Sequence, residues 1–239
     1  MVWATRFLFS FSHNTATDGA YHSYRTKNDQ SQWAYVPSPP SPGFLRGVSA
    51  GYTVWAIETT VERMARSSGR DPLEWRLAHL DDPRLRVVLS RVGEMSGWGD
   101  TTRHLGLGIM SFRGSSIACV AEVANGRVTG MWIAADVGRI IHRDNVLGQI
   151  EGGAIWGISM ALSESLTYRD GRAQIDSLGD YPILGSDEVP PIDIKLIEPR
   201  PDDSPFGVGE IGVPTAIPAI CNAMEQATGQ QFDRLPLSI

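Results

Sequence analysis

The sequence is poor in cysteine, in clustered basic residues and in long hydrophobic runs, and each shortage excludes a class of protein. Its two cysteines, Cys119 and Cys221, stand alone in apolar contexts, which excludes a disulfide framework, zinc-type spacing and iron–sulfur ligation by this chain. We expect both to be small buried hydrophobic residues. The net charge of −6, without a basic run, argues against a nucleic-acid or anionic-membrane partner. No stretch reaches the roughly 18 apolar residues of a membrane-spanning helix.

The overall composition is that of an ordinary globular protein. Hydrophobic residues make up 42% and charged residues 20% of the 239 residues, enough for one large domain or two small ones. The helical and strand-like patterns lack the regular alternation of a parallel doubly wound sheet. The predicted fold class is therefore α+β, with mixed helices and antiparallel hairpins.

Three parts are predicted along the chain. Residues 1–43 combine an N-terminal strand with an extended Pro-rich segment, because several prolines between residues 37 and 42 favour a stiff, open backbone. Residues 44–100 are predicted to be helical. Residues 101–239 are predicted to form an α+β region that ends in a helix over residues 214–228.

The helical part carries clear start signals. Residues 53–67 have amphipathic periodicity, and we expect Val61 and Met64 among the inward-facing side chains. Asp71-Pro72 and Asp82-Pro83 each place an aspartate at a helix cap and a proline at the first helical position. Two further helices are therefore predicted to begin there.

The α+β part is dominated by hairpins. Residues 106–123 and 127–137 flank Asn125-Gly126, a pair suited to a tight turn, and predict one long hairpin. A second hairpin is predicted to turn at Asp170-Gly171, and residues 192–197 form another strand.

A helix over residues 143–164 is unusually rich in glycine. Each interior glycine weakens a helix by about 1 kcal/mol relative to alanine. Such a helix indicates close approach to another backbone or to a ligand.

The segment Gly207-Val208-Gly209-Glu210-Ile211-Gly212 places one carboxylate in a glycine-rich turn just ahead of the last predicted helix. Glycines allow a bulky ligand to approach closely, so Glu210 is well placed to act as a base on something docked against the turn. The alternative is a surface loop whose glutamate merely favours the helix N-terminus. The G-x-G-x-x-G spacing would also suit a dinucleotide site, but no apolar strand precedes it and too little chain follows, so that reading is rejected.

Three short segments together resemble a known family. They are Phe44-Leu45-Arg46-Gly47-Val48, Gly148-Gln149-Ile150-Glu151-Gly152-Gly153 and the segment around Glu210, followed by the ending over residues 223–237. In this order they resemble the C-terminal portion of the molybdopterin-binding large subunit of the xanthine dehydrogenase/aldehyde oxidase family. Within that family they are most similar to the branch of isoquinoline 1-oxidoreductase and bacterial aldehyde dehydrogenases. Asp71-Pro72-Leu73-Glu74-Trp75-Arg76-Leu77, Asp136-Val137-Gly138-Arg139 and Asp180-Tyr181-Pro182 fall between them in the expected order.

The resemblance implies a role for each matching residue. Glu210 matches the active-site glutamate, a general base in the hydroxylation of an aldehyde or N-heterocycle with water-derived oxygen. Gln149, with Gly148, matches a pterin-binding segment, and Arg46, with Gly47 and Gly209, matches backbone turns beneath the metal. Val48 stands where relatives carry a substrate-contacting aromatic, which implies an aliphatic pocket wall. No protein side chain is expected to bind the metal directly. From the residues alone, Gln149 could instead be a helix-packing amide and Arg46 a surface ion-pair partner.

The resemblance also implies a cofactor and partners. The cofactor is the molybdenum cofactor, as molybdopterin or its cytosine dinucleotide form, and electrons would pass to 2Fe-2S clusters on an iron–sulfur subunit. Family subunits are about three times longer and carry a glycine–glutamine–glycine loop that this sequence lacks. We therefore expect an N-terminal molybdopterin-binding chain as partner, with a cytochrome c or flavin subunit as a further candidate.

Other functions are weighed against this one. The main alternative is a truncated, non-catalytic assembly module of the same family. A hydrolase is disfavoured because no Gly-x-Ser-x-Gly elbow is present. A bacterial location is expected, in the cytoplasm or the periplasm, with a membrane-associated complex also open.

Overall fold

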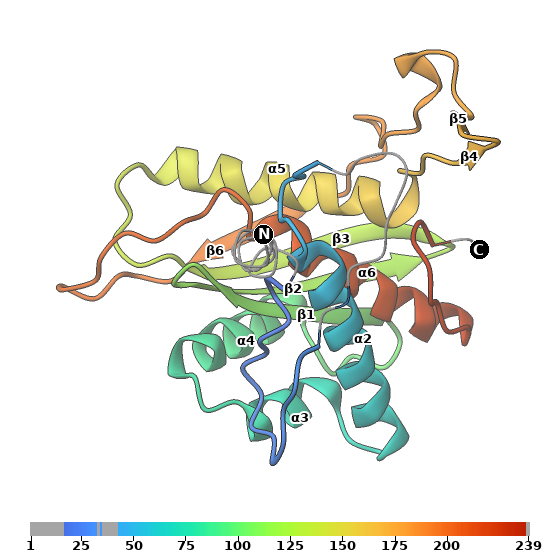
Figure 1. Cartoon of the computed structure of the whole chain (residues 1–239). Helices are drawn as coiled ribbons and strands as arrows, with labels where there is room; N and C mark the ends of the chain where they lie inside the picture. Colours follow the sequence, from blue (N-terminus) through green and yellow to red (C-terminus); the bar gives the residue numbers. More distant parts are fainter. Residues whose placement is uncertain (1–16, 33, 35–42, 238–239) are drawn as a thin grey trace, which may run out of the picture.

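The computed structural model describes residues 17–32, 34 and 43–237, so the predicted N-terminal strand and most of the Pro-rich segment lie outside the described residues. Figure 1 shows the arrangement of the helices and strands. In chain order these elements are α2 (Ala50–Ser67), α3 (Pro72–His79), α4 (Pro83–Ser96), β1 (His104–Phe112), β2 (Ser115–Ala124), β3 (Arg127–Asp136), α5 (Arg143–Leu162), β4 (Tyr168–Arg169), β5 (Arg172–Ala173), the 3-10 helix η1 (Leu178–Asp180), β6 (Ile192–Leu196) and α6 (Gly212–Thr228). The fold is α+β, as predicted.

A four-stranded sheet in the order β1-β2-β3-β6 forms the centre of the fold. β1, β2 and β3 are antiparallel neighbours, and β6 pairs in parallel with β3. The predicted turn at Asn125-Gly126 is confirmed, but the first arm of the predicted hairpin is wrong: it contains two strands joined at Arg113-Gly114. Both turn residues have positive φ, +52° and +87°, which closes the chain within two residues.

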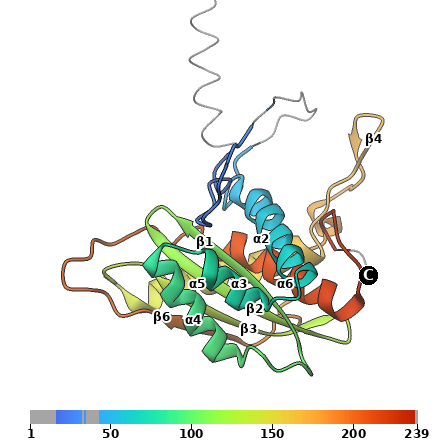
Figure 2. The ribbon, with the colours of Figure 1, turned by 90° about the horizontal axis from the view of Figure 1, so that it is seen from below.

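Helices cover both faces of this sheet. α4 packs against β2 and β3 on one face, and α6 packs against β1 and β2 on the other, with α5 and α2 packed on α6. Figure 2, seen from below, shows α3 and α4 lying across the sheet. The strands alternate accordingly: Ile117 and Cys119 of β2 face the α6 side, whereas Ala118 and Val120 face the α4 side.

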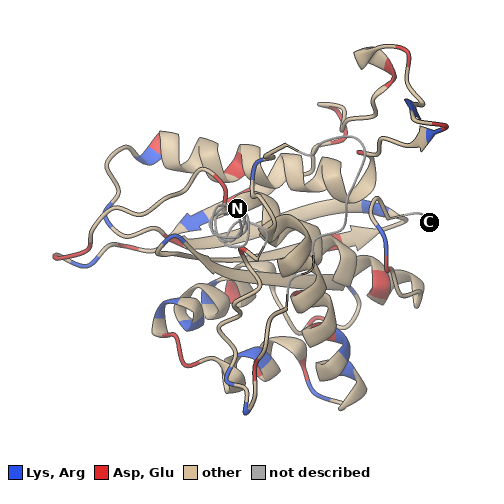
Figure 3. Ribbon diagram, in the orientation of Figure 1, with Lys and Arg blue, Asp and Glu red and all other residues tan. Residues whose placement is uncertain are grey.

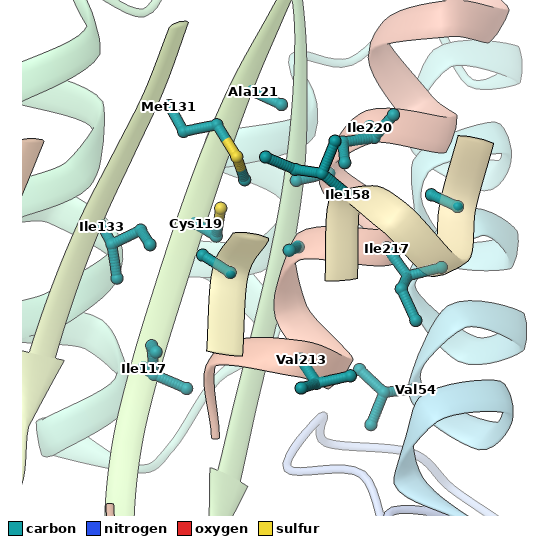
Figure 4. Packing of buried hydrophobic residues seen from close by; sticks show 14 of the residues in the cluster. Val54, Ile117, Cys119, Ala121, Met131, Ile133, Ile158, Val213, Ile217 and Ile220 are labelled. Atoms are coloured by element: carbon teal, nitrogen blue, oxygen red, sulfur yellow. The ribbon is translucent and has the colours of Figure 1, made fainter. Parts of the chain in front are cut away.

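The α6 side is packed by backbone contact as well as by side chains (Figure 4). A Cβ at Gly106 would lie 2.1 Å from the Ala223 nitrogen of α6, and a Cβ at Gly108 would lie 2.5 Å from the Thr215 oxygen. On the far side of α6, a Cβ at Gly212 would lie 2.5 Å from the Ile150 oxygen of α5. The glycine-rich helix α5 was predicted to approach another backbone or a ligand closely. The approach to a backbone is confirmed: a Cβ at Gly157 would lie 2.9 Å from the Val213 oxygen, and a Cβ at Gly153 would lie 3.1 Å from the Gly212 Cα.

The helix starts largely follow the sequence signals. The side chains of Asp71 and Asp82 accept hydrogen bonds from the first-turn amides of α3 and α4, as predicted. α2 begins three residues earlier than predicted, and Met64, expected inside, is 51% exposed. Both cysteines are buried and free, and burial raises the pKa of Cys221 to about 11.

A buried ion-pair network fastens α3 to α2. Arg76, which is fully buried, donates to Glu58 at 3.1 Å and to Glu62 at 2.7 Å. The Tyr24 hydroxyl donates to the other oxygen of Glu58 at 2.8 Å. Because every charge in this cluster has a partner, the burial of the guanidinium does not leave an isolated ion.

Residues 163–190 leave the body of the molecule between α5 and β6. They carry the small β4–β5 hairpin, which turns at Asp170-Gly171 as predicted, and they project away from the sheet in Figure 1. None of the helices in the described residues is both long and apolar enough to cross a membrane.

Candidate functional site

The three segments that were singled out in the sequence meet at one place. Arg46 comes from the turn before α2, Gln149 from the second turn of α5, and Glu210 from the turn before α6. Direct hydrogen bonds connect all three segments, although more than 100 positions separate Arg46 from each of the others. The packing of α2, α5 and α6 on one another brings these segments together.

Arg46 lies at the centre of this cluster. Its Nε donates to the Gly209 carbonyl at 2.5 Å, and one Nη donates to the Gln149 carbonyl at 2.8 Å. Partial burial lowers the pKa of Arg46, and the charge of Glu210 opposes that shift. An arginine remains protonated at neutral pH after such a shift, so Arg46 is a fixed cation that ties two segments together through their carbonyl groups. It is therefore not the surface ion-pair partner that the sequence left open.

The Gln149 side chain is exposed and its orientation is determined by Arg46. The Arg46 guanidinium, which has only donors, contacts the Gln149 Oε1 at 3.2 Å. The amide oxygen therefore faces Arg46, and the amide NH₂ group of this exposed residue has no hydrogen-bond partner among the described residues. Gln149 does not pack inside the helix bundle, and it presents two N–H donors at the surface.

Glu210 is half-buried, two residues before the start of α6. Its Oε1 accepts a hydrogen bond from the Gly47 backbone N–H at 3.2 Å. Among the described residues, no donor lies within hydrogen-bonding distance of Oε2. The carboxylate is thus held by one oxygen and has the other available for a proton or a donor from outside the chain.

The turn that contacts Glu210 has an unusual backbone. Gly47 has φ +91°, and Val48 has φ +43°, a region that a β-branched residue rarely adopts. Such strain costs about 1–3 kcal/mol and is commonly found where function fixes a conformation. Val48 packs partly against the hydrophobic core, and its proposed contact with substrate stays a prediction.

The residues that hold the loop before Glu210 were not predicted from the sequence. Phe206 N–H donates to the Val137 carbonyl at 3.0 Å, and Arg139 N–H donates to the Ser204 carbonyl at 3.2 Å. Ser115 Oγ donates to the Gly207 carbonyl at 2.8 Å. In the sequence, Asp136-Val137-Gly138-Arg139 was used only as one of the motifs that fall in the family's order. Its place directly after a predicted strand was the one signal that its backbone could bind a second segment.

The surface around these residues is open. Gly148, Gln149 and Gly209 are exposed, and a Cβ at Gly148 would meet nothing within 4 Å. A Cβ at Gly209 would lie 3.7 Å from the Gln149 Oε1. The cluster thus combines a carboxylate, an exposed amide and glycine backbone that a large planar ligand can approach. In the described residues, no group of three or more His, Cys, Asp or Glu side chains is placed to hold a metal ion.

The family of the chain agrees with this arrangement. Residues 114–190 match the molybdopterin cofactor-binding domain family. Together with the relatives described below, this match confirms the resemblance of the motifs to molybdopterin-binding subunits of the xanthine dehydrogenase family. The match is consistent with a C-terminal portion of such a subunit.

Two curated relatives illustrate the relationship. The chain is 36% identical over 207 residues to the isoquinoline 1-oxidoreductase subunit beta of Brevundimonas diminuta, covering 81% of this chain and 26% of the relative. It is 28% identical over 248 residues to a membrane-bound aldehyde dehydrogenase of Gluconacetobacter polyoxogenes, whose name includes pyrroloquinoline-quinone, covering 92% and 31%. The chain thus spans less than a third of the length of either relative.

A solved structure supports the fold. Quinoline 2-oxidoreductase from Pseudomonas putida 86 superposes with a TM-score of 0.70 at 15% identity, covering 80% of this chain and 51% of that chain. At this identity the comparison establishes the shared α+β architecture.

Proposed function

We propose that this chain supplies the base-bearing part of a molybdenum-cofactor oxidoreductase that hydroxylates an aldehyde or an N-heterocycle with water-derived oxygen. The observation that carries the proposal is the meeting of Arg46, Gln149 and Glu210 in one hydrogen-bonded cluster. The family and the names of the relatives supply the chemical class.

The exposed residues suit a pterin ligand with its phosphate. The exposed NH₂ group of Gln149 matches acceptor groups such as a ring carbonyl or a phosphate oxygen. Gly148 and Gly209 leave the backbone beside it uncovered. Gly47 allows the turn before α2 to pack closely on α6, since a Cβ there would lie 3.3 Å from the Pro214 side chain. When bound, the cofactor would accept two electrons and present the water-derived oxygen to the substrate. Arg46 would hold the Gln149 and Gly209 backbones at a fixed distance from each other, and it would add a positive charge to the site.

Glu210 acts as the base in this proposal. Hydroxylation of a carbon by water releases two electrons and two protons, and Glu210 Oε2 is placed to take one of those protons. The hydrogen bond from Gly47 to Oε1 keeps the carboxylate aimed at the open surface while its protonation changes. Val48, from the same turn, would form an aliphatic wall of the substrate site.

The remaining parts of such an enzyme would come from partner chains. An N-terminal molybdopterin-binding chain would cover the open surface, and an iron–sulfur subunit with 2Fe-2S clusters would take the electrons onward. A cytochrome c or flavin subunit could receive them next. The complex would be bacterial, in the cytoplasm or periplasm, and the pterin would be molybdopterin or its cytosine dinucleotide form.

The test is the variant Glu210→Gln in the complex purified from its natural source. We expect turnover of an aldehyde or N-heterocycle to fall by at least about 10²-fold, with molybdenum per chain unchanged, because the amide keeps the shape but cannot take the proton. The matched control is Glu151→Gln, an exposed glutamate on α5 that should retain full turnover.

The same preparation separates this function from the alternatives. Substantial turnover in Glu210→Gln would remove Glu210 as the base. A wild-type protein without molybdenum and without turnover would favour the non-catalytic assembly module. Pyrroloquinoline-quinone in place of molybdenum would contradict the cofactor assignment.

A further inference from the structure

Phe206 lies four residues before Glu210 and sits between two glycines. A Cβ at Gly114, in the β1–β2 turn, would lie 2.4 Å from one edge of the Phe206 ring. A Cβ at Gly138, just after β3, would lie 2.7 Å from the opposite edge. The ring therefore occupies a slot that exists only because both positions lack a side chain.

A charged pair closes this slot. The Arg84 guanidinium of α4 lies over the Phe206 ring, 4.8 Å from its centroid. Arg84 Nε donates to Asp136 Oδ2 at 2.8 Å and another of its nitrogens binds Oδ1, while Asp136 also accepts from the Gly138 N–H at 3.2 Å. Burial acts to raise the pKa of Asp136, but the Arg84 and Gly138 hydrogen bonds outweigh it and hold that pKa below its usual range. The pair is therefore fully charged near neutral pH.

The chain has two fixed points shortly before Glu210. At the first, the Phe206 ring, the Phe206 N–H bond to the Val137 carbonyl and the Ser115 bond to the Gly207 carbonyl hold the backbone. At the second, the Arg46 bond holds the Gly209 carbonyl. Only Val208 lies between these two points. Together they therefore determine the backbone position from which the Glu210 side chain extends.

We propose that Phe206 is a positioning residue for Glu210: by filling the slot beneath Arg84 it sets the place of the turn that carries the proposed base. This inference rests on the proposed function for its catalytic consequence, but its structural part, the position of residues 207–210, is independent of any reaction.

A matched cluster at the opposite end of the sheet provides the control. Arg103 pairs with Glu122 through two hydrogen bonds of 2.8 and 2.9 Å, and its guanidinium lies 5.0 Å from the centroid of the Trp132 ring. This cluster has the same chemistry as Arg84, Asp136 and Phe206 but does not contact residues 207–210. Equal substitutions in the two clusters therefore separate positioning of the site from general stabilisation.

The experiment compares Phe206→Ala with Trp132→Ala in the full purified complex, by hydrogen–deuterium exchange of the backbone amides. We expect the amides of residues 139 and 206, which donate to the Ser204 and Val137 carbonyls, to exchange about 10-fold faster in Phe206→Ala and at the wild-type rate in Trp132→Ala, because only the first substitution frees the loop. Phe206→Tyr, which keeps the ring, should restore slow exchange. Should Phe206→Ala not fold, Phe206→Leu against Trp132→Leu gives the same comparison with a smaller loss of side-chain volume.

Activity supplies the second readout. With molybdenum content unchanged, kcat in Phe206→Ala should fall on the order of 10²-fold with little change in KM, since a displaced base affects the chemical step more than binding. Unchanged exchange at the amides of residues 139 and 206 would overturn the inference, as would faster exchange with an unchanged kcat. A failure of the proposed function is recognised separately, by full turnover in Glu210→Gln, and the exchange result then still decides whether Phe206 fixes the turn.

Discussion

The two faces of the central sheet are packed in different ways. On the face toward α6, glycines bring backbones into contact: Gly106 and Gly108 of β1 lie against α6, and Gly212 of α6 lies against α5. On the face toward α4, branched side chains fill the space, among them Leu89 and Val92. Figure 3 shows Lys and Arg residues on this side of the sheet as well, over α3, α4 and the end of α2.

The difference explains where the site lies. A contact between backbones fixes the distance between two elements to within tenths of an ångström, whereas interdigitated side chains tolerate repacking. All three site segments flank helices of the α6 face: the turn before α2, the start of α5 and the turn before α6. We infer that the α6 face sets the geometry of the site and that the α4 face mainly supports its stability.

The largest expected effect comes from adding one carbon to the tight face. Gly108→Ala would place a Cβ 2.5 Å from the Thr215 oxygen of α6, and neither backbone can yield without moving a whole element. We expect the free energy of unfolding to fall by about 4 kcal/mol or more, measured by urea denaturation. Gly130→Ala is the control, since its Cβ would meet only the Trp132 ring, at 3.1 Å. Equal losses in the two variants would contradict the proposed difference between the faces.

On the other face, the largest expected effect is the loss of a charge. Arg76→Met leaves Glu58 buried without a cation, whereas Glu62 keeps its pair with Arg66 at 2.8 Å. The uncompensated Glu58 carboxylate should lower the free energy of unfolding by about 3–5 kcal/mol. Adding Glu58→Gln should recover part of the loss, because the remaining carboxylate, Glu62, is still paired with Arg66.

The control for this prediction is Arg91→Met. Arg91 pairs with Glu94 on the surface, with exposed fractions of 48% and 66%, so we expect a change of about 0–1 kcal/mol. If Arg76→Met were as mild as Arg91→Met in urea denaturation, the ion pairs would have no structural importance.

Local signals predicted much of the fold. The Asp-Pro caps of α3 and α4 and the Asn125-Gly126 turn are decided by neighbouring residues, so they could be predicted from the sequence. The Arg113-Gly114 turn was missed because an arginine at positive φ is favoured only by the strands that it joins. The burial of Arg76 could not be predicted either, since an arginine in a short amphipathic helix is normally exposed. The three-part division of the chain stays a prediction.

For the site, the sequence predicted the cluster members but not how they contact one another. Arg46, Gln149 and Glu210 were chosen from short motifs, and the structure brings them together. The bonds from Arg46 to two carbonyl groups depend on the packing of α2, α5 and α6, which no local pattern encodes. Phe206 was missed for the same reason, because its slot is formed by glycines far away in the sequence.

The smallest expected effect concerns the contact that joins the two faces. Arg84 belongs to α4 but reaches Asp136 and Phe206, so the pair links the supporting face to the loop before Glu210. The pKa of Asp136 is lowered in the folded protein, so its contribution to stability is present above the unfolded pKa of about 3.9 and is lost as pH falls through the lower folded value. Asp136→Asn should therefore cost about 1 kcal/mol at pH 7, and the gap to wild type should close as the pH falls below 4 in urea denaturation.

Glu122→Gln is the matched control for this last prediction. The hydrogen bond from Arg103 lowers the pKa of Glu122 as well, so the stability gap of this variant should close over the same acidic range. The two variants should differ only in the loop: Asp136→Asn should speed exchange of the Arg139 and Phe206 amides, and Glu122→Gln should not. A gap that stays constant with pH would show that Asp136 acts through packing alone. Equal exchange in the two variants would mean that the α4 face has no influence on the position of Glu210. In that case the α6 face alone would set the geometry of the site, and the α4 face would contribute only to stability.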